Sequence, residues 1–152
     1  MPAFRREAVL EWTGEVVKGS GEVVAGSGAF ALAATFPRLA GEPAGTTTPE
    51  ELLAASHATC FGIALRSVLA QRGATAERIR ATATLTADKG GGRIRIVRAD
   101  LEAQVEGLAG LAAEGLDAAA QAAEEACTIS VLLRASVPVA ARVIPVESGR
   151  DA

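Results

Sequence analysis

The chain contains 152 residues, of which 49% are hydrophobic, 22% are charged and only 3% are aromatic. This composition is that of a globular domain and excludes an intrinsically disordered chain. The net charge of −3 and the scattered basic residues exclude a nucleic-acid surface, which requires clustered basic side chains. Alanine supplies much of the apolar content and buries little area per side chain. We therefore expect further burial against a second subunit and predict a homo-oligomer.

The N-terminal segment, MPAFRREAVLEW, carries charges where a signal peptide requires an apolar run, and we expect that no apolar segment approaches about 18 residues. We therefore expect a cytoplasmic protein with no membrane partner. In the cytoplasm the two cysteines are more often redox-active, metal-binding or packed in the core than joined in a structural disulfide.

Alternating apolar and polar side chains predict three strands in a β-meander over residues 5–34. The first is expected to run from Arg5 to Val17 with a bend at Gly14. The second follows a glycine-containing turn and runs from Glu22 to Ala25. A loop over residues 36–47 then leads to a helix, and loops in this position often carry functional residues.

The central helix, over residues 48–73, has clear start and stop signals. Thr48 can cap its first turn, Pro49 fits the first helical position, and Glu51 completes a capping box three residues after the cap. Gly73 can adopt the left-handed conformation that ends many helices.

Small and apolar side chains recur within this helix at steps of three and four residues, which predicts one stripe that faces the core. The stripe consists of Leu53, Ser56, Cys60, Ile63 and Ser67. Cys60 is therefore expected on the inner face, where a thiol either fills space or is protected for chemistry.

The second half of the chain begins with a β-hairpin predicted over residues 79–105, with its turn at residues 88–92. The apolar phase of the returning strand changes at Ile96 and Val97, which predicts a β-bulge there. Helices are expected over residues 112–135, and Thr128 can cap the last of them. A final strand follows over residues 137–144.

This order of elements predicts a single α+β domain over residues 1–152, because runs of strands are interrupted by helices and do not alternate strictly with them.

The two cysteines are the candidates for nucleophilic chemistry. Taken singly, Cys60 and Cys127 are each most simply interpreted as small buried hydrophobic residues. Cys127 stands at a helix start, where a thiolate is favoured. If the two thiols lie within reach of each other, one can be oxidised by a peroxide to a sulfenic acid and the other can condense with it to form a disulfide.

Metal binding has little support in the sequence. There is one histidine, His57, and no CxxC motif, so no spacing collects four ligands. His57 precedes Cys60 by three residues and can touch its sulfur on the helix surface, but a packed structural role is the favoured interpretation. We therefore expect no metal and no bound cofactor.

Two charged residues near the start of the central helix are further candidates. Glu50 lies in the first turn, where an acid stabilises the helix dipole, and Arg38 is the only cation in the preceding loop. Glu50 and Cys60 are ten residues apart, which separates them by about 15 Å along one helix. They can share a site only if two such helices pack antiparallel across a dimer axis.

The block TPEELLAASHATCFGIAL, followed at a distance by ACTISVLL and a closing strand, resembles the OsmC/Ohr family of osmotically inducible and organic-hydroperoxide-resistance proteins, and its OsmC branch most of all. The resemblance extends from WTGEVVKGSG to the final strand. It implies an α+β intertwined homodimer in which antiparallel sheets wrap around long central helices. It also implies a thiol peroxidase that reduces organic hydroperoxides in preference to hydrogen peroxide.

By position, the resemblance implies that Cys60 is the peroxidatic cysteine, Cys127 is the resolving cysteine and Glu50 is the acidic partner of an active-site arginine. Arg38 is the only arginine in the loop where similar sequences carry that residue, and Lys18 is the alternative cation. Relatives usually have proline directly after the resolving cysteine, where this chain has Thr128.

We therefore predict a cysteine-based organic hydroperoxide reductase whose partners are a second copy of the chain, the hydroperoxide and an external dithiol reductant. The alternative is a non-catalytic small-molecule binding protein on the same fold, in which both cysteines are packing residues. A third possibility is an interaction module with an exposed apolar face and no reactive thiol.

Overall fold

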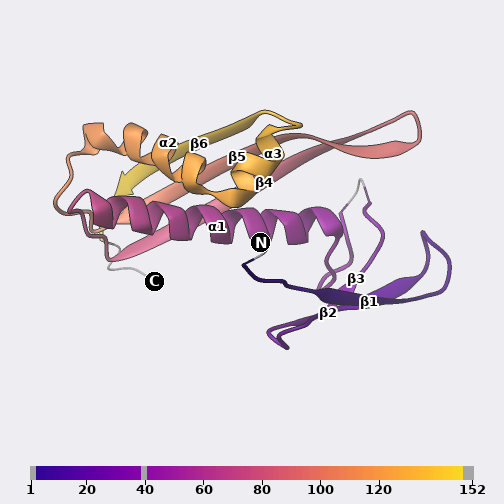
Figure 1. Cartoon of the computed structure of the whole chain (residues 1–152). Coiled ribbons are helices and arrows are strands. Elements are labelled where there is room, and N and C mark those ends of the chain that lie inside the picture. The colour runs from indigo at the N-terminus through magenta and orange to yellow at the C-terminus, as the bar shows by residue number, and fades with distance from the viewer. Residues whose placement is uncertain (1–2, 39–40, 149–152) are drawn as a thin grey trace. The chain divides into compact units, whose positions relative to one another are not determined.

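A computed structural model describes residues 3–38 and 41–148 of the chain. The chain divides into two compact units, Met1–Leu52 and Leu53–Ala152, and each is described by itself. The first unit contains strands β1 (Ala8–Thr13), β2 (Ser20–Ala25) and β3 (Ala31–Ala34). Helix α1 (Pro49–Gln71) begins in the first unit and belongs for most of its length to the second (Figure 1).

The predicted β-meander is confirmed, with two differences in its boundaries. Strands β1, β2 and β3 form an antiparallel sheet in that order. The first strand ends at Thr13, so Val16 and Val17 lie in the turn and not in a strand. The second strand was predicted to start at Glu22, but it starts at Ser20, which pairs with Thr13. Gly14, at φ 91°, ends the first strand because its backbone turns into a region that other residues rarely adopt.

The second unit contains a sheet of strands β4 (Arg78–Gly90), β5 (Arg93–Glu106) and β6 (Val139–Val146). Strands β4 and β5 form the predicted hairpin, which closes at Gly91 and Gly92, both in the left-handed region. Thr86 pairs with Arg98 while Ala87 pairs with Ile96, so Val97 is the extra residue of a β-bulge. The bulge predicted from the change in apolar phase is therefore confirmed.

Strand β6 pairs with β5 in parallel, so this sheet is mixed and not purely antiparallel as expected. The connection between the two strands contains a short 3₁₀ helix η1 (Ala113–Gly115) and helices α2 (Leu116–Ala126) and α3 (Thr128–Arg134). These helices carry the chain back to the end of the sheet where β5 began, and a strand that starts there runs parallel to it.

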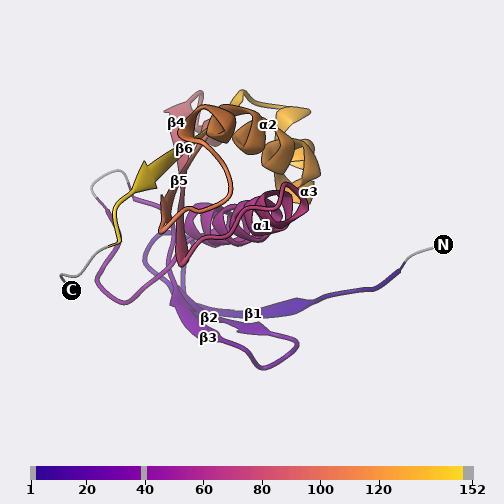
Figure 2. The ribbon, with the colours of Figure 1, turned by 90° about the vertical axis from the view of Figure 1, so that its left-hand side faces the viewer.

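The hydrophobic core of the second unit lies between this sheet and the helices α1 and α2, which lie together on one side of the sheet in Figure 2. Alternate residues of β5 point into it, and α2 contributes small alanines that allow close approach. The larger members of the core are Phe61, Leu65, Leu69, Leu101, Val105 and Leu116.

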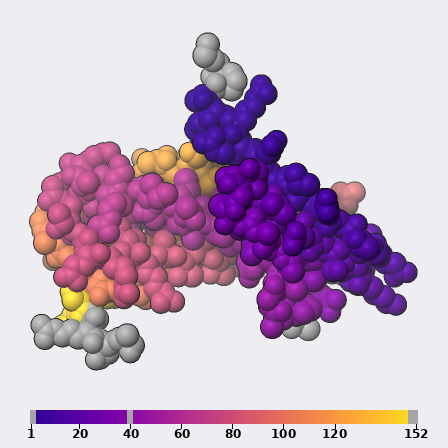
Figure 3. All heavy atoms as spheres, turned by 90° about the horizontal axis from the view of Figure 1, so that it is seen from below, coloured from indigo at the N-terminus to yellow at the C-terminus, as the bar shows by residue number. Residues whose placement is uncertain are grey.

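The stripe of α1 that packs into this core differs from the predicted one. The buried residues are His57, Phe61, Leu65, Val68 and Leu69. Apolar residues occur all round this helix, so the periodicity did not single out one face. Figure 3 shows a face on which the magenta atoms of α1 lie at the surface, and Ile63, predicted to be inside, is 67% exposed.

Helix α1 is also long and apolar enough, by length and composition alone, to cross a membrane, with a mean hydropathy of 1.4 over its most apolar window. The expectation that no apolar segment approaches about 18 residues is therefore wrong. The central helix of a soluble protein passes the same test. In this fold α1 contributes Phe61 and Leu65 to the core of the second unit.

Candidate functional site

The two cysteines, far apart in the sequence, lie 3.2 Å apart in the second unit. Cys60 lies in the middle of α1, and Cys127 lies at the junction between α2 and α3. Both are free thiols; Cys127 is fully buried, whereas Cys60 is partly exposed. The structure thus brings together the two residues that the sequence singled out, close enough for a disulfide to form with a small side-chain movement.

Cys127 is held by the backbone of α3, of which it is the N-cap. Its extended backbone (φ −79°, ψ 110°) ends α2, and its sulfur accepts a hydrogen bond of 3.4 Å from the Ser130 backbone N–H. The prediction that Thr128 caps this helix is therefore wrong. Thr128 is the first helical residue, a position that also suits proline because its N–H has no partner within the helix.

Burial raises the pKa of the Cys127 thiol, because a thiolate is poorly solvated in this apolar core. Hydrogen bonds from the backbone N–H and the side chain of Ser130 act in the opposite direction, and the nearby Cys60 raises the pKa further. The net effect is upward, so Cys127 is a protonated thiol at neutral pH. Its location at a helix start was expected to favour the thiolate, but burial outweighs that effect.

His57 is fully buried and contacts a serine that the sequence analysis did not single out. Its Nε2 atom lies 2.7 Å from the Ser130 hydroxyl oxygen. The hypothesis of a contact with the Cys60 sulfur is replaced by this pairing, while the favoured packed role of His57 agrees with its burial. Only the position of Ser130, three residues after Cys127 in the first turn of α3, pointed to its involvement.

The burial of His57 has a consequence for stability. Burial lowers its pKa below the ordinary 6.5, so the unfolded chain takes up this proton more readily than the folded chain. The free energy of unfolding is therefore expected to fall as the pH drops below about 6.5. Urea denaturation of the parent and of His57→Gln at about pH 7.5 and about pH 5.5 measures this contribution. The parent is expected to lose more stability than the variant, and equal losses would contradict the assignment.

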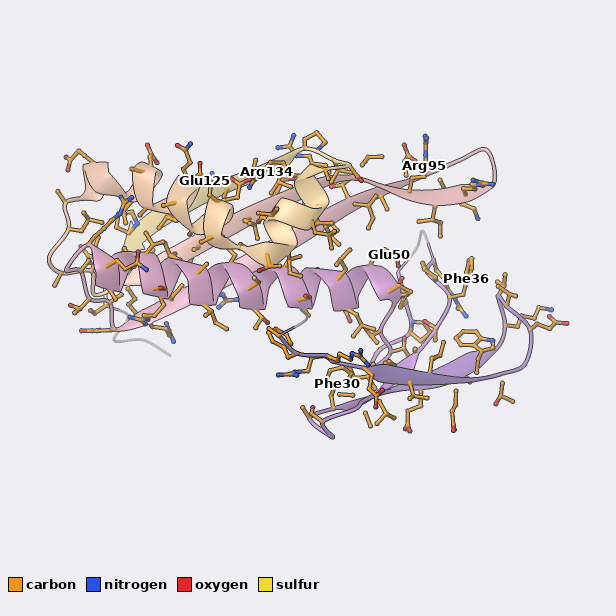
Figure 4. The ribbon with its side chains drawn as sticks, in the orientation of Figure 1. Phe30, Phe36, Glu50, Arg95, Glu125 and Arg134 are labelled. Carbon is orange, nitrogen blue, oxygen red and sulfur yellow. The ribbon has the colours of Figure 1, made fainter. Side chains whose placement is uncertain are left out.

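The charged candidates Glu50, Arg38 and Lys18 all lie in the first unit. Figure 4 labels Glu50 at the start of that helix. Its Oε2 atom is buried and has no hydrogen-bond partner among the described residues. Arg38 is exposed in the loop before the helix, where its backbone N–H donates to Glu42 Oε1 at 3.3 Å. Lys18 is exposed in the turn between β1 and β2.

Within residues 3–38 and 41–148, no ion pair joins Glu50 to Arg38 or Lys18. The predicted pairing of Glu50 with a cation is thus not formed in the described part of one chain. A buried carboxylate oxygen without a partner is costly, and this oxygen is available to a donor that a second chain can supply.

The start of α1 is capped by a pair of threonines and not by one residue. The Thr48 hydroxyl accepts a long hydrogen bond of 3.5 Å from the Glu51 backbone N–H, as predicted for the cap. The Glu51 carboxylate, however, accepts from the Thr47 hydroxyl at 2.8 Å. Glu51 is thus engaged in capping, which leaves its neighbour Glu50 as the carboxylate free for another role.

An apolar cavity of about 410 Å³ lies within the first unit. Its walls come from the small sheet, the loop that follows it and the first turn of α1. They include Leu10, Trp12, Val23, Phe36 and Leu52. Phe36, labelled in Figure 4, lies on the loop that leads to α1. Almost no polar surface lines this cavity, so it is suited to an apolar group.

Among the residues that the structure describes, no group of three or more His, Cys, Asp or Glu side chains gathers in a way that could hold a metal ion. The expectation that the chain needs no bound cofactor stays a prediction.

The family model described as "OsmC-like protein" matches residues 41–142 of this chain. The protein named Peroxiredoxin OsmC from Escherichia coli (strain K12) is 35% identical over 91 residues, which cover 60% of this chain and 63% of that protein. The match thus spans less than two thirds of the length of this curated relative.

Solved structures resemble the chain over nearly its whole length. An organic hydroperoxide resistance protein OsmC from Legionella pneumophila is 26% identical, with a TM-score of 0.74 and coverage of 94% of this chain and 98% of that one. An organic hydroperoxide resistance protein from Elizabethkingia anophelis is 22% identical, with a TM-score of 0.77 and coverage of 95% and 99%, and shows the fold alone. With the family model matching two thirds of its residues, the chain belongs to the OsmC-like protein family, and its fold is the α+β fold of OsmC/Ohr structures.

Proposed function

We propose that this protein is a thiol-dependent peroxidase that reduces organic hydroperoxides. The observation that carries the proposal is the pair of free cysteines 3.2 Å apart, one partly exposed and one fully buried. The Escherichia coli relative is named a peroxiredoxin, and the Legionella pneumophila structure is titled an organic hydroperoxide resistance protein. Both names support the same chemistry.

In the proposed reaction, the Cys60 thiolate attacks the terminal oxygen of the hydroperoxide and breaks the O–O bond. Cys60 becomes a sulfenic acid, and the alkoxide that leaves takes up a proton to form the alcohol. The Cys127 sulfur then attacks the Cys60 sulfur, so that a disulfide forms and water is released. An external dithiol reduces this disulfide and returns both thiols, in keeping with a reducing cytoplasm.

The difference in exposure between the two cysteines supports the proposed roles. Cys60 is partly exposed, so a hydroperoxide can approach it. Cys127 is fully buried and burial raises its pKa, which makes it a poor first nucleophile. Once Cys60 is oxidised, however, Cys127 is already the neighbour that can condense with it.

A preference for organic hydroperoxides is supported by the apolar surroundings of Cys60, which packs against the hydrophobic core of the second unit. An alkyl group buried against apolar side chains there gains about 25 cal/mol for each Å² removed from water. Hydrogen peroxide has no apolar surface and gains nothing there.

The protein is further proposed to act as a homodimer in which α1 meets its symmetry mate. This helix exposes Ile63, and only 28% of its most apolar window is buried within one chain. Glu50 carries a buried oxygen without a partner among the described residues. Because Glu50 and Cys60 are ten residues apart on α1, an antiparallel pair of helices would bring Glu50 of one subunit toward Cys60 of the other. Glu50 and a cation, Arg38 or Lys18, would then position the peroxide and favour the charged form of Cys60.

Counting free thiols tests the reaction and separates it from the alternative of a non-catalytic binding protein. One equivalent of cumene hydroperoxide per chain, added to the reduced protein, is expected to convert both thiols of each chain into one disulfide. Non-reducing electrophoresis is expected to show no covalent dimer, because the disulfide forms within a chain. Two thiols that persist after the addition would support a binding protein with packed cysteines.

Mixed dimers test the shared site. Glu50→Gln is expected to lower turnover by about ten- to a hundredfold, because the carboxylate that orients the cation is lost. Glu51→Gln, in the same helical turn, is the matched control and is expected to retain turnover. Co-purified dimers of one Glu50→Gln chain and one Cys60→Ser chain are expected to regain about half the turnover of the parent, since they contain one complete site. Mixed dimers that remain as slow as the Glu50→Gln homodimer would show that each site lies within one chain.

A further inference from the structure

A buried pair of side chains lies directly behind Cys127 and has no part in the attack on the peroxide. Ser130 is fully buried, and its backbone N–H donates to the Cys127 sulfur at 3.4 Å. Its hydroxyl oxygen lies 2.7 Å from Nε2 of His57. The His57 ring, Ser130 and the Cys127 thiol are therefore linked by consecutive hydrogen-bond contacts. All three residues are fully buried.

The direction of the hydrogen bonds follows from the other ring nitrogen. Nδ1 of His57 is buried and has no partner among the described residues. A buried acceptor without a partner is tolerated more often than a buried N–H donor without one, so the ring proton belongs on Nε2. His57 then donates to the Ser130 oxygen, and the Ser130 hydroxyl proton is left to donate to the Cys127 sulfur.

The surroundings of Cys127 contain few other groups that titrate. The inward side chains of α2, β5 and β6 are apolar, among them Ala123, Leu101 and Val143. On α1 the titratable groups of the site are Cys60 and His57 themselves. Glu124 of α2 and Arg134 of α3 are paired with each other at 2.9 Å. Ser130 is therefore the main group that can favour a negative charge on the Cys127 sulfur.

We propose that Ser130, oriented by His57, is a positioning residue that stabilises the Cys127 thiolate and so promotes closure of the disulfide with Cys60. The inference rests on the proposed peroxidase function and concerns its second step. The hydrogen bonds of the Ser130 backbone and side chain each lower the pKa of Cys127 against the larger effect of burial, which supports this assignment.

In this step the Cys127 thiol first gives up its proton, and its sulfur, held by the Ser130 hydroxyl and backbone N–H, attacks the Cys60 sulfenic sulfur. The S–O bond of the sulfenic acid breaks, and the departing hydroxide combines with a proton to form water. The Cys127 sulfur supplies the electron pair of the new S–S bond, and the hydroxide leaves with the electron pair of the broken S–O bond. The oxidation of the Cys127 thiol to the disulfide level is thus balanced by the reduction of the Cys60 sulfenic sulfur to the same level. His57 stays neutral throughout, because burial lowers its pKa.

The first measurement is the titration of Cys127 alone, in a Cys60→Ser background. The chain has two cysteines and no tyrosine, so thiolate absorbance near 240 nm reports Cys127 without interference from tyrosinate. Ser130→Ala and His57→Leu are each expected to move the midpoint of this titration to higher pH. His57→Gln, whose side-chain amide can donate to Ser130 but cannot titrate, is expected to restore the midpoint toward that of the parent.

The second measurement is a single turnover in the chain with both cysteines, in which sulfenic acid is trapped with dimedone and free thiols are counted over time. Ser130→Ala is expected to leave the oxidation of Cys60 unchanged and to slow disulfide closure by roughly three- to tenfold at neutral pH. At alkaline pH the closure rate is expected to recover, because the thiolate then forms without the serine. A structural role alone would not produce this rescue by pH.

An unchanged midpoint in Ser130→Ala, or a midpoint in His57→Gln that shifts as far as in His57→Leu, would overturn the proposal. Circular dichroism identifies any variant that does not fold, and if Ser130→Ala is one of these, the two His57 variants decide the outcome. The titration does not depend on catalysis. A protein that fails to react with hydroperoxide therefore refutes the proposed function without changing what the titration says about Ser130.

Discussion

Replacement of Cys60 with serine is expected to abolish the consumption of organic hydroperoxide, with a loss of at least about a thousandfold. A serine hydroxyl is not ionised at neutral pH and cannot form the sulfenic acid, so the first bond is never made. The fold is expected to persist, because serine has nearly the size of cysteine and this position is partly exposed. Peroxide loss in the presence of a dithiol such as dithiothreitol measures the effect.

Cys127→Ser is the matched control and separates the two roles. This variant is expected to consume one equivalent of hydroperoxide per chain as fast as the parent, and then to hold Cys60 as a sulfenic acid that dimedone labels. Because the second cysteine is missing, no intramolecular disulfide can form. The single thiol of each chain, that of Cys60, is therefore lost to the sulfenic acid. Undiminished turnover in Cys60→Ser, or loss of the first turnover in Cys127→Ser, would contradict the proposed order of attack.

Truncation of Phe61 to alanine is expected to produce the largest loss of stability among substitutions in α1. Phe61 is fully buried in the core of the second unit and directly follows Cys60 in α1. Large-to-small changes at such positions cost about 3–5 kcal/mol, because apolar contact is lost and a cavity remains. This is a large part of the roughly 5–15 kcal/mol by which a domain is stable. Urea denaturation followed by circular dichroism measures the change.

Val131→Ala on α3 is the control for this experiment. Val131 is 51% exposed, so its truncation is expected to change the free energy of unfolding by about 0.5 kcal/mol or less. If Phe61→Ala were no more destabilising than Val131→Ala, the assignment of α1 as the central core helix of the second unit would be wrong.

Local signals in the sequence were sufficient for several parts of the fold. The proline and the capping threonine marked the start of α1, and Gly73, at φ 74°, marked its end. The change in apolar phase located the bulge at Val97. These features depend on residues close in sequence, so the reason for each is contained in a short segment.

Other parts depend on contacts between distant segments. The inner face of α1 was assigned to the wrong stripe, because the helix is apolar on several sides. Only the formation of one core with residues of α2 and β5 decides which side of α1 is covered. The parallel pairing of β6 with β5 was missed for a similar reason. The alternation of side chains in a strand is the same in parallel and antiparallel sheets, and the path of α2 and α3 decides the direction.

The features of the candidate site also fall into those set by local sequence and those set by tertiary structure. The sequence by itself determined the α+β class, the limits of the central helix and the identity of Cys60 and Cys127 as the two thiols in question, because residue type and local spacing carry that information. Only the tertiary structure decided that the thiols meet, that burial outweighs the helix start at Cys127, and that His57 bonds Ser130. Distance, solvation and hydrogen-bond partners are properties of segments brought together by folding, and no local pattern encodes them.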